Sequence, residues 1–173
     1  MAHREIVTHP APVLRKKARK ITDFGPELQL LIDDMVETMR EAPGVGLAAP
    51  QVGVPLQLIV VEYSEKAEEE GSEELPKLYT IANPEIIRYS DDQELGTEGC
   101  LSIPGFVGDV ERPLAITLKG QNRRGKPLRL KADGWLARIF QHEVDHLNGV
   151  LFIDRAEKVW KVEDQTGQVM PAD

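Results

Sequence analysis

The spacing of apolar residues divides the first third of the chain into one helix and one buried strand. Apolar side chains recur at helical spacing over 27–42, between a Gly-Pro pair at 25–26 and a Pro-Gly pair at 43–44, which predicts an amphipathic helix. Residues 56–63 are rich in Val, Ile and Leu, as buried strands are. The glycine-containing segment 44–51 is predicted as a tight loop whose backbone comes close to another segment.

Shorter apolar runs predict further strands in the middle of the chain. They cover 78–82, 86–89, 114–119 and 128–132, and turn residues at 122–125 join the last two. The chain therefore combines helices and strands and shows no internal repeat.

A second helix is predicted between Asp133, a good N-cap, and Asn148-Gly149, a common C-terminal stop. One of its stripes, expected to pack in the core, consists of Leu136, Phe140 and Leu147. Another stripe consists of Trp135, Ile139, His142 and His146. Trp135 and Ile139 are thus candidates for an apolar pocket beside the histidines, and ordinary core packing of both is the alternative.

Two segments are too polar to pack well. Residues 64–77 are rich in Glu and poor in apolar side chains, which predicts a mobile surface loop. The chain also turns polar after Asp154, so 155–173 is predicted as a tail that frays or is disordered. The remaining residues, 1–154, are expected to form a single catalytic domain.

Composition narrows the class of protein further. The 173-residue chain has a formal charge of -8, which disfavours DNA binding driven by the overall field of the protein. Its single cysteine cannot form an internal disulfide, and no segment has the apolar length of a signal peptide or membrane span. We therefore expect a soluble, cytoplasmic protein that binds neither DNA nor membrane.

The most informative motif is His-Glu-Val-Asp-His at 142–146. His142 and His146 lie one helical turn apart and can bind one metal ion, while Glu143 beside them can act on a water that the metal activates. Catalytic metal sites of this kind usually take three protein ligands. Cys100, flanked by Gly99, is the candidate third ligand, although a lone cysteine is more commonly a small buried apolar residue.

Three motifs in this order resemble those of the peptide deformylases. They are GVGLAAPQ at 44–51, EGCLS at 98–102 and QHEVDHLNG at 141–149, and the likeness runs from residues 6–7 to 151–154. The resemblance implies an α+β fold in which mostly antiparallel sheets pack around a central C-terminal helix that carries the HExxH metal motif.

The resemblance also implies an activity. This is hydrolysis of the N-terminal formyl group of formyl-methionyl nascent polypeptides, which releases formate and a free amine. Glu143 would serve as general base and then general acid. The Gln51 side chain and the Leu101 N–H would stabilise the oxyanion, and Gly46 would let its loop approach closely. The alternative for Gln51 is a purely structural role that ties its loop to the cysteine segment.

Further expectations follow for the ligands and partners. The expected substrate pocket consists of Gly44, Val45, Glu98, Gly99, Trp135 and Ile139. One divalent ion is expected per chain, Fe²⁺ by resemblance, with Zn²⁺, Ni²⁺ or Co²⁺ also compatible with two imidazoles and a thiolate. Partners would be formyl-Met peptides and nascent chains. A transient ribosome contact finds no support in the polar tail, and an organelle is the alternative to the cytoplasm.

Two other functions remain open at this point. A metallopeptidase shares the His-Glu helix but usually takes its third ligand from downstream, where this chain has no histidine. An inactive binding module would be expected to lack Glu143, Gln51 or Cys100, and all three are present. Asp145 is interpreted as structural, with Arg112 as its predicted buried partner and an exposed pair of little energetic value as the alternative.

Overall fold

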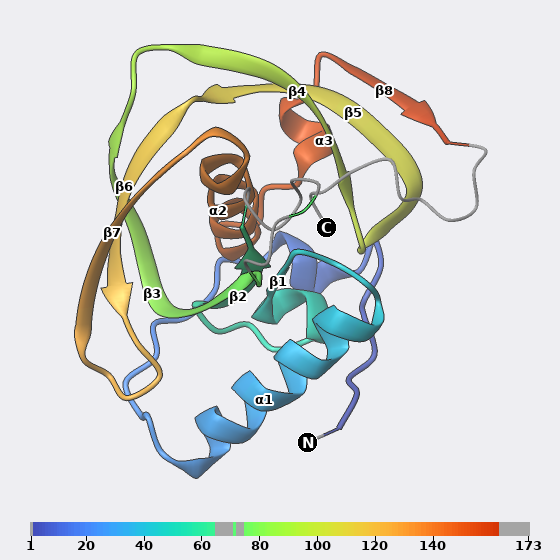
Figure 1. Ribbon diagram of the computed structural model, residues 1–173. Coiled ribbons are helices and arrows are strands. Elements are labelled where there is room, and N and C mark those ends of the chain that lie inside the picture. The colour runs from blue at the N-terminus through green and yellow to red at the C-terminus, as the bar shows by residue number, and fades with distance from the viewer. Residues whose placement is uncertain (1, 65–70, 72–74, 163–173) are drawn as a thin grey trace.

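Two antiparallel sheets surround one central helix in the computed structural model, which describes residues 2–64, 71 and 75–162 (Figure 1). The larger sheet has the strand order β1-β2-β3-β6-β7, with bounds Gly46–Ala48, Leu58–Tyr63, Lys77–Tyr89, Ala115–Gln121 and Pro127–Asp133. The smaller sheet has the order β4-β5-β8, with bounds Gln93–Cys100, Ile103–Pro113 and Lys158–Lys161. The helices are α1 (Pro26–Glu41), α2 (Gly134–Leu147) and α3 (Phe152–Arg155), with 3₁₀ turns η1 (Pro12–Arg15) and η2 (Ala49–Val52). The expected α+β fold with antiparallel sheets around a C-terminal helix is confirmed.

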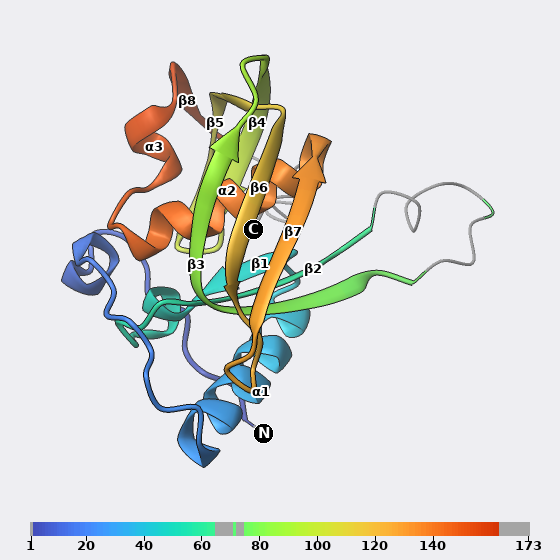
Figure 2. The same ribbon diagram turned by 90° about the vertical axis from the view of Figure 1, so that its left-hand side faces the viewer.

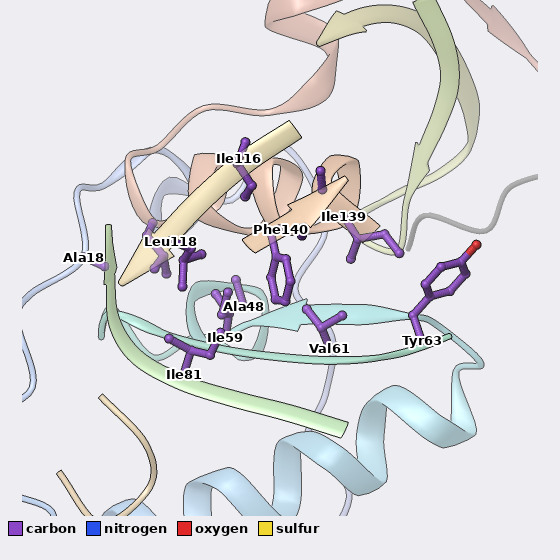
Figure 3. Packing of buried hydrophobic residues seen from close by; sticks show 13 residues of the cluster. Ala18, Ala48, Ile59, Val61, Tyr63, Ile81, Ile116, Leu118, Ile139 and Phe140 are labelled. Atoms are coloured by element: carbon purple, nitrogen blue, oxygen red, sulfur yellow. The ribbon is translucent and has the colours of Figure 1, made fainter. Parts of the chain in front are cut away.

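Helix α2 lies between the two sheets and is buried on most of its surface (Figure 1). Ile139 and Phe140 are both fully buried and pack in one cluster with Ile59, Val61 and Ile81 of the larger sheet (Figure 3). Apolar residues of both stripes predicted for this helix therefore pack in the same cluster. Because sheets cover the helix on more than one side, both stripes reach apolar neighbours.

Helix α1 covers the opposite face of β1 and β2 (Figure 2). Its buried residues Leu31, Ile32 and Met35 pack with Leu58 and Val60 of β2, whereas the intervening β2 residues face α2. The alternation of the strand thus places one apolar layer on each side of the sheet. β1 and β2 are held between two helices, which fixes the position of the Gly46 backbone.

Several predicted boundaries need correction. The segment 44–51 is not a loop throughout, because it forms strand β1 and then the turn η2. The two runs at 78–82 and 86–89 belong to one bent strand, β3, which begins at Lys77 and has register irregularities near Glu85. Asp133 precedes α2 as expected, but its side chain makes no capping hydrogen bond.

The ends of the predicted loop and tail also differ from expectation. Of the acidic segment 64–77, residues 65–70 and 72–74 lie outside the described residues. In the expected tail, 158–161 forms strand β8 paired with β5, α3 extends across the predicted domain boundary at Asp154, and 163–173 lies outside the described residues. None of the helices among the described residues has the length and apolar character needed to cross a membrane.

Arg15 and Asp154 join the N-terminal segment to α3. Arg15 Nη1 and Nη2 donate to the two Asp154 carboxylate oxygens at 2.5 and 3.1 Å, and Leu151 N donates to Asp154 Oδ2 at 2.9 Å. The hydrogen bonds from Arg15 hold the pKa of Asp154 below its ordinary value, with burial opposing them and the Leu151 N–H and the Arg15 charge assisting.

We expect Asp154→Asn to lower the free energy of unfolding by about 0.5–1 kcal/mol at pH 7, the upper range for a solvent-screened pair. Because the folded pKa is depressed, the stabilisation is present above the unfolded pKa of about 4 and is lost as the pH falls through the folded pKa. Urea unfolding of both proteins at several pH values measures this difference. A deficit that stays constant from neutral to acid pH would contradict the assignment.

Candidate metal centre and active site

The fold brings the three predicted metal ligands together from two elements. Cys100 is the last residue of β4, where the β4–β5 register shifts, and His142 and His146 lie on α2. One ligand atom from each of the three residues lies within 4.8 Å of the other two, and all three side chains are buried. Residues far apart in the sequence therefore converge on one point.

The donor set and its geometry fit a divalent transition metal. Cys100 Sγ lies 3.4 Å from His146 Nε2. Tetrahedral Zn²⁺ with ordinary Zn–S and Zn–N bonds would separate such atoms by about 3.6 Å. A thiolate with two imidazoles suits Zn²⁺, Fe²⁺, Co²⁺ and Ni²⁺ and does not suit the hard ions Mg²⁺ and Ca²⁺.

Two neighbours fix the orientation of His142. Its Nδ1 lies 3.0 Å from Glu98 Oε1, and its ring stacks on Phe152 of α3 at a centroid distance of 6.3 Å. Burial would raise the pKa of Glu98, but hydrogen bonds from His142 and Arg112 outweigh it and hold this pKa far below its usual range. An ionised Glu98 only accepts, so His142 carries its hydrogen on Nδ1 and presents the Nε2 lone pair to the metal position.

A chain of ion pairs extends from the buried Glu98 to the half-exposed Arg155 of α3. Arg112 donates from Nε and Nη2 to both Glu98 oxygens at 2.6 and 2.9 Å, and from Nη1 to Asp145 Oδ2 at 3.0 Å. Asp145 also accepts two hydrogen bonds from Arg155. The predicted Asp145–Arg112 pair is confirmed, and its burial excludes the alternative of an exposed pair.

Glu143 lies against the backbone of β1. A methyl group added at Gly46 would stand 2.6 Å from Glu143 Oε2 and 3.0 Å from its Cγ and Cδ. Residue 46 must therefore be glycine for Glu143 to keep this position, although Gly46 is not among the residues with positive φ. The backbone of segment 44–51 thus approaches another group closely, as predicted. That group is the Glu143 carboxylate.

Gln51 is fully buried beside Cys100. Its Oε1 accepts a hydrogen bond from Ala48 N at 2.9 Å, and its Nε2 donates to Cys100 Sγ at 3.6 Å and to Ser102 Oγ at 3.2 Å. Leu101 lies at the turn that joins β4 to β5. Gln51 does tie its segment to the cysteine strand, and its amide also faces the ligand cluster.

The arrangement of these motifs is matched by a family of known enzymes. The family model described as polypeptide deformylase matches residues 3–162, which is most of the chain. The chain belongs to the polypeptide deformylase family. The three motifs that carried the resemblance thus converge at one site in a member of that family.

Sequence and structure comparisons agree with this membership. The chain is 44% identical over 164 residues to the peptide deformylase of Natranaerobius thermophilus, covering 95% of this chain and 99% of the relative. It is 48% identical over 179 residues to that of Symbiobacterium thermophilum, covering 99% and 78%. The crystal structure of the Thermotoga maritima peptide deformylase superposes with a TM-score of 0.80 at 40% identity, covering 90% of this chain and 99% of that one. The Ehrlichia chaffeensis enzyme in complex with actinonin gives a TM-score of 0.83 at 39% identity, covering 91% of each chain.

The expected pocket residues lie in different environments. Gly44 donates its N–H to Met39 O and so ends α1, while Val45 packs at the margin of the α2 cluster. Glu98 is fully buried in its ion pairs and faces His142, so its place is behind the metal ligand. Ile139 is a core residue, and Trp135 is half-buried at the margin of the same cluster.

Sequence reasoning missed three residues at this site. Ser102 accepts from Gln51, Phe152 stacks on His142, and Arg138 binds Glu98. Ser102 could have been found as the last residue of the EGCLS motif, and Arg138 because it lies one helical turn before His142 and therefore on the same face. An arginine in a helix is normally assumed to be exposed, and this one is buried.

Proposed function

We propose that this deformylase-family chain removes the N-terminal formyl group from formyl-methionyl nascent polypeptides and releases formate and a free amine. The observation that carries the proposal is the convergence of Cys100, His142 and His146 within 4.8 Å, with Glu143 on the same helix held against Gly46. The family match and the full-length relatives support the same activity.

Cys100, His142 and His146 would hold the metal ion. A divalent ion bound there supplies Lewis acidity that polarises the formyl carbonyl and makes the attacking water more acidic. Glu98 keeps His142 in the tautomer that binding requires, and Phe152 limits rotation of its ring. Because all three ligand residues are buried, few water molecules can compete with them for the metal ion.

Glu143 would move the proton in both halves of the reaction. It accepts a proton from water as that water attacks the formyl carbon, and it then donates a proton to the leaving amine nitrogen. One carboxylate suffices because its proton is returned within the same turnover. The Gly46 backbone limits where this carboxylate can lie.

Gln51 and the Leu101 N–H would stabilise the negative oxygen of the tetrahedral intermediate. The hydrogen bond from Ala48 N to Gln51 Oε1 orients the amide so that its NH₂ group points toward the cysteine side of the site. An amide held in this way before substrate arrives needs little reorganisation during the reaction. Gln51 Nε2 donates to Cys100 Sγ and to Ser102 Oγ, so one of these two hydrogen bonds would be exchanged for the one to the oxyanion.

Val45, Trp135 and Ile139 would contribute the apolar surroundings of the methionine side chain. The Arg138 guanidinium lies over the Trp135 ring at 5.4 Å from its centroid, which limits rotation of the indole. Burial of a methionine side chain contributes roughly 1.5–3 kcal/mol to binding. Gly44 and Gly99 would complete this pocket, whereas Glu98 would support it from behind His142.

Formate release separates this function from the alternatives. Metal-loaded protein is incubated with a formyl-Met tripeptide and, in parallel, with a blocked peptide that offers only internal peptide bonds. The proposal expects formate from the first and no cleavage of the second. Cleavage of the internal bonds would favour a metallopeptidase, and neither reaction by a fully metallated chain would favour a binding module.

We propose Fe²⁺ as the working metal, with Zn²⁺, Ni²⁺ or Co²⁺ as alternatives. Activity of the Fe²⁺-loaded chain is expected to decay in air, because oxygen oxidises the ferrous ion and the Cys100 thiolate can be oxidised with it. The Ni²⁺-loaded chain should retain its activity over the same period. Parallel assays of air-exposed and anaerobic samples, with thiol titration of Cys100, test this; equal decay of both metal forms would contradict it.

A further inference from the structure

Arg138 occupies a position that links α2 to both long strands of the smaller sheet. It lies one helical turn before His142, and only 4% of its surface is exposed. Its Nη1 donates to Glu98 Oε2 at 2.6 Å and to Val110 O at 2.8 Å, and its Nη2 donates to Glu94 O at 2.7 Å. The guanidinium therefore binds the same carboxylate that orients His142.

Gly96 provides the space for this guanidinium. It pairs with Val110 across β4 and β5 directly under Arg138. A methyl group at residue 96 would lie 2.8 Å from Arg138 Cζ and 2.9 Å from its Nε, closer than nonbonded atoms normally approach. The Trp135 ring covers the guanidinium at 5.4 Å. The slot is thus formed by a glycine, two backbone carbonyls and an aromatic ring.

Glu98 is held at both oxygens. Oε1 faces His142 Nδ1 and accepts from Arg112 Nη2, while Oε2 accepts from Arg112 Nε and from Arg138 Nη1. Without Arg138, one arginine alone would resist rotation and translation of the carboxylate. A small displacement of Glu98 would then change the direction of the His142 ring.

We propose that Arg138 is a positioning residue for the metal ligand His142, acting through Glu98, and that residue 96 is glycine in order to admit the Arg138 guanidinium. This inference rests on the proposed function only in requiring that a metal ion occupies the site. Removing the hydrogen-bond partner of a metal-binding histidine typically weakens metal binding by roughly 10–100-fold. We expect an effect of about this size from loss of Arg138.

The experiment is competition between a chelator and the full-length chain for Zn²⁺. Arg138→Met keeps an unbranched chain and removes every donor, and it should raise the Kd for Zn²⁺ by roughly 10–100-fold. Arg138→Lys retains one cationic donor group and should recover part of the loss. The visible absorption of Co²⁺-loaded Arg138→Met should also shift, because the His142 ligand changes its direction.

Arg4→Met is the matched control. Arg4 donates to the buried carboxylate of Asp34 on α1, outside the Glu98 cluster, so its loss removes an arginine from a buried carboxylate elsewhere in the fold, although Arg4 is more exposed than Arg138. This variant should lose thermal stability and keep the Zn²⁺ affinity and the Co²⁺ spectrum of the parent. An Arg138→Met protein that behaved in the same way would overturn the proposal, because Arg138 would then have a structural role only.

Gly96→Ala provides a second test should Arg138→Met not fold. The added methyl should displace the guanidinium and raise the Kd for Zn²⁺ in the parent, where an unchanged Kd would overturn the proposal; in any Arg138 variant that folds, Arg138→Lys or Arg138→Met, it should have little further effect. Independent, additive effects would overturn the proposal. A changed metal affinity without any deformylation would instead count against the proposed function alone, since the binding measurement does not use the reaction.

Discussion

Replacing Glu143 with alanine is expected to lower kcat for deformylation by about 10²–10⁴-fold, the usual range for loss of a general acid–base group. Glu143 is fully buried and its carboxylate is confined by the Gly46 backbone, so the substitution removes an acid–base group that is held in a defined place. KM should change little, because this carboxylate acts on the reacting atoms and does not line the side-chain pocket. Steady-state kinetics with a formyl-Met tripeptide measure both parameters.

Glu143→Gln tests whether the loss of activity comes from the missing carboxylate or from the smaller side chain of the alanine variant. It keeps the volume of the side chain but cannot accept the proton, so its kcat should fall as far as that of the alanine variant. Metal content measured on each purified variant shows that the three ligands are still occupied. Activity of either metal-loaded variant close to that of the parent would remove Glu143 from the reaction.

Gly46→Ala is expected to lower kcat by about 10²-fold with only a small loss of stability. The added methyl would stand 2.6 Å from Glu143 Oε2, and the far end of a flexible side chain moves more easily than the strand β1. A displacement of roughly 1 Å of a reacting group is enough for a loss of that size. Kinetics, together with thermal unfolding, separate the effect on the base from an effect on the fold.

A double-mutant cycle identifies the route of this effect. If Gly46→Ala acts by displacing Glu143, it should cost almost nothing further in a Glu143→Ala background. If the two losses multiply instead, the methyl group disturbs another part of the site, such as the strand pairing of β1. That result would contradict the close contact as the reason for glycine at this position.

The parts of the molecule that sequence predicted well are governed by local signals. Helix α2 begins after Asp133 and ends before Asn148-Gly149, as predicted; Asp133 has the extended backbone of an N-cap residue although its side chain makes no capping hydrogen bond. The metal ligands could be proposed for a similar reason, since His142 and His146 are one turn apart on one helix. Cys100 is distant in sequence and was found through its motif rather than through periodicity.

The parts that sequence missed depend on contacts between distant segments. Strands β4 and β5 carry glycines, prolines and charged residues without a regular apolar alternation, and they are held by pairing with each other over 93–113. The buried location of Arg138 depends on that pair as well, because Gly96 and the carbonyls of Glu94 and Val110 come from it. The complete burial of Ile139 could not be predicted from the sequence, because it depends on how the larger sheet covers α2.

This site hydrolyses an N-terminal formamide. The most direct measurement is formate production, with mass spectrometry of the peptide, when the chain loaded anaerobically with Fe²⁺ is given a formyl-Met tripeptide. We expect formate and intact tripeptide with a free amine in equal amounts, and neither product from the Glu143→Ala variant. Absence of formate from a fully metallated parent chain would contradict the claim.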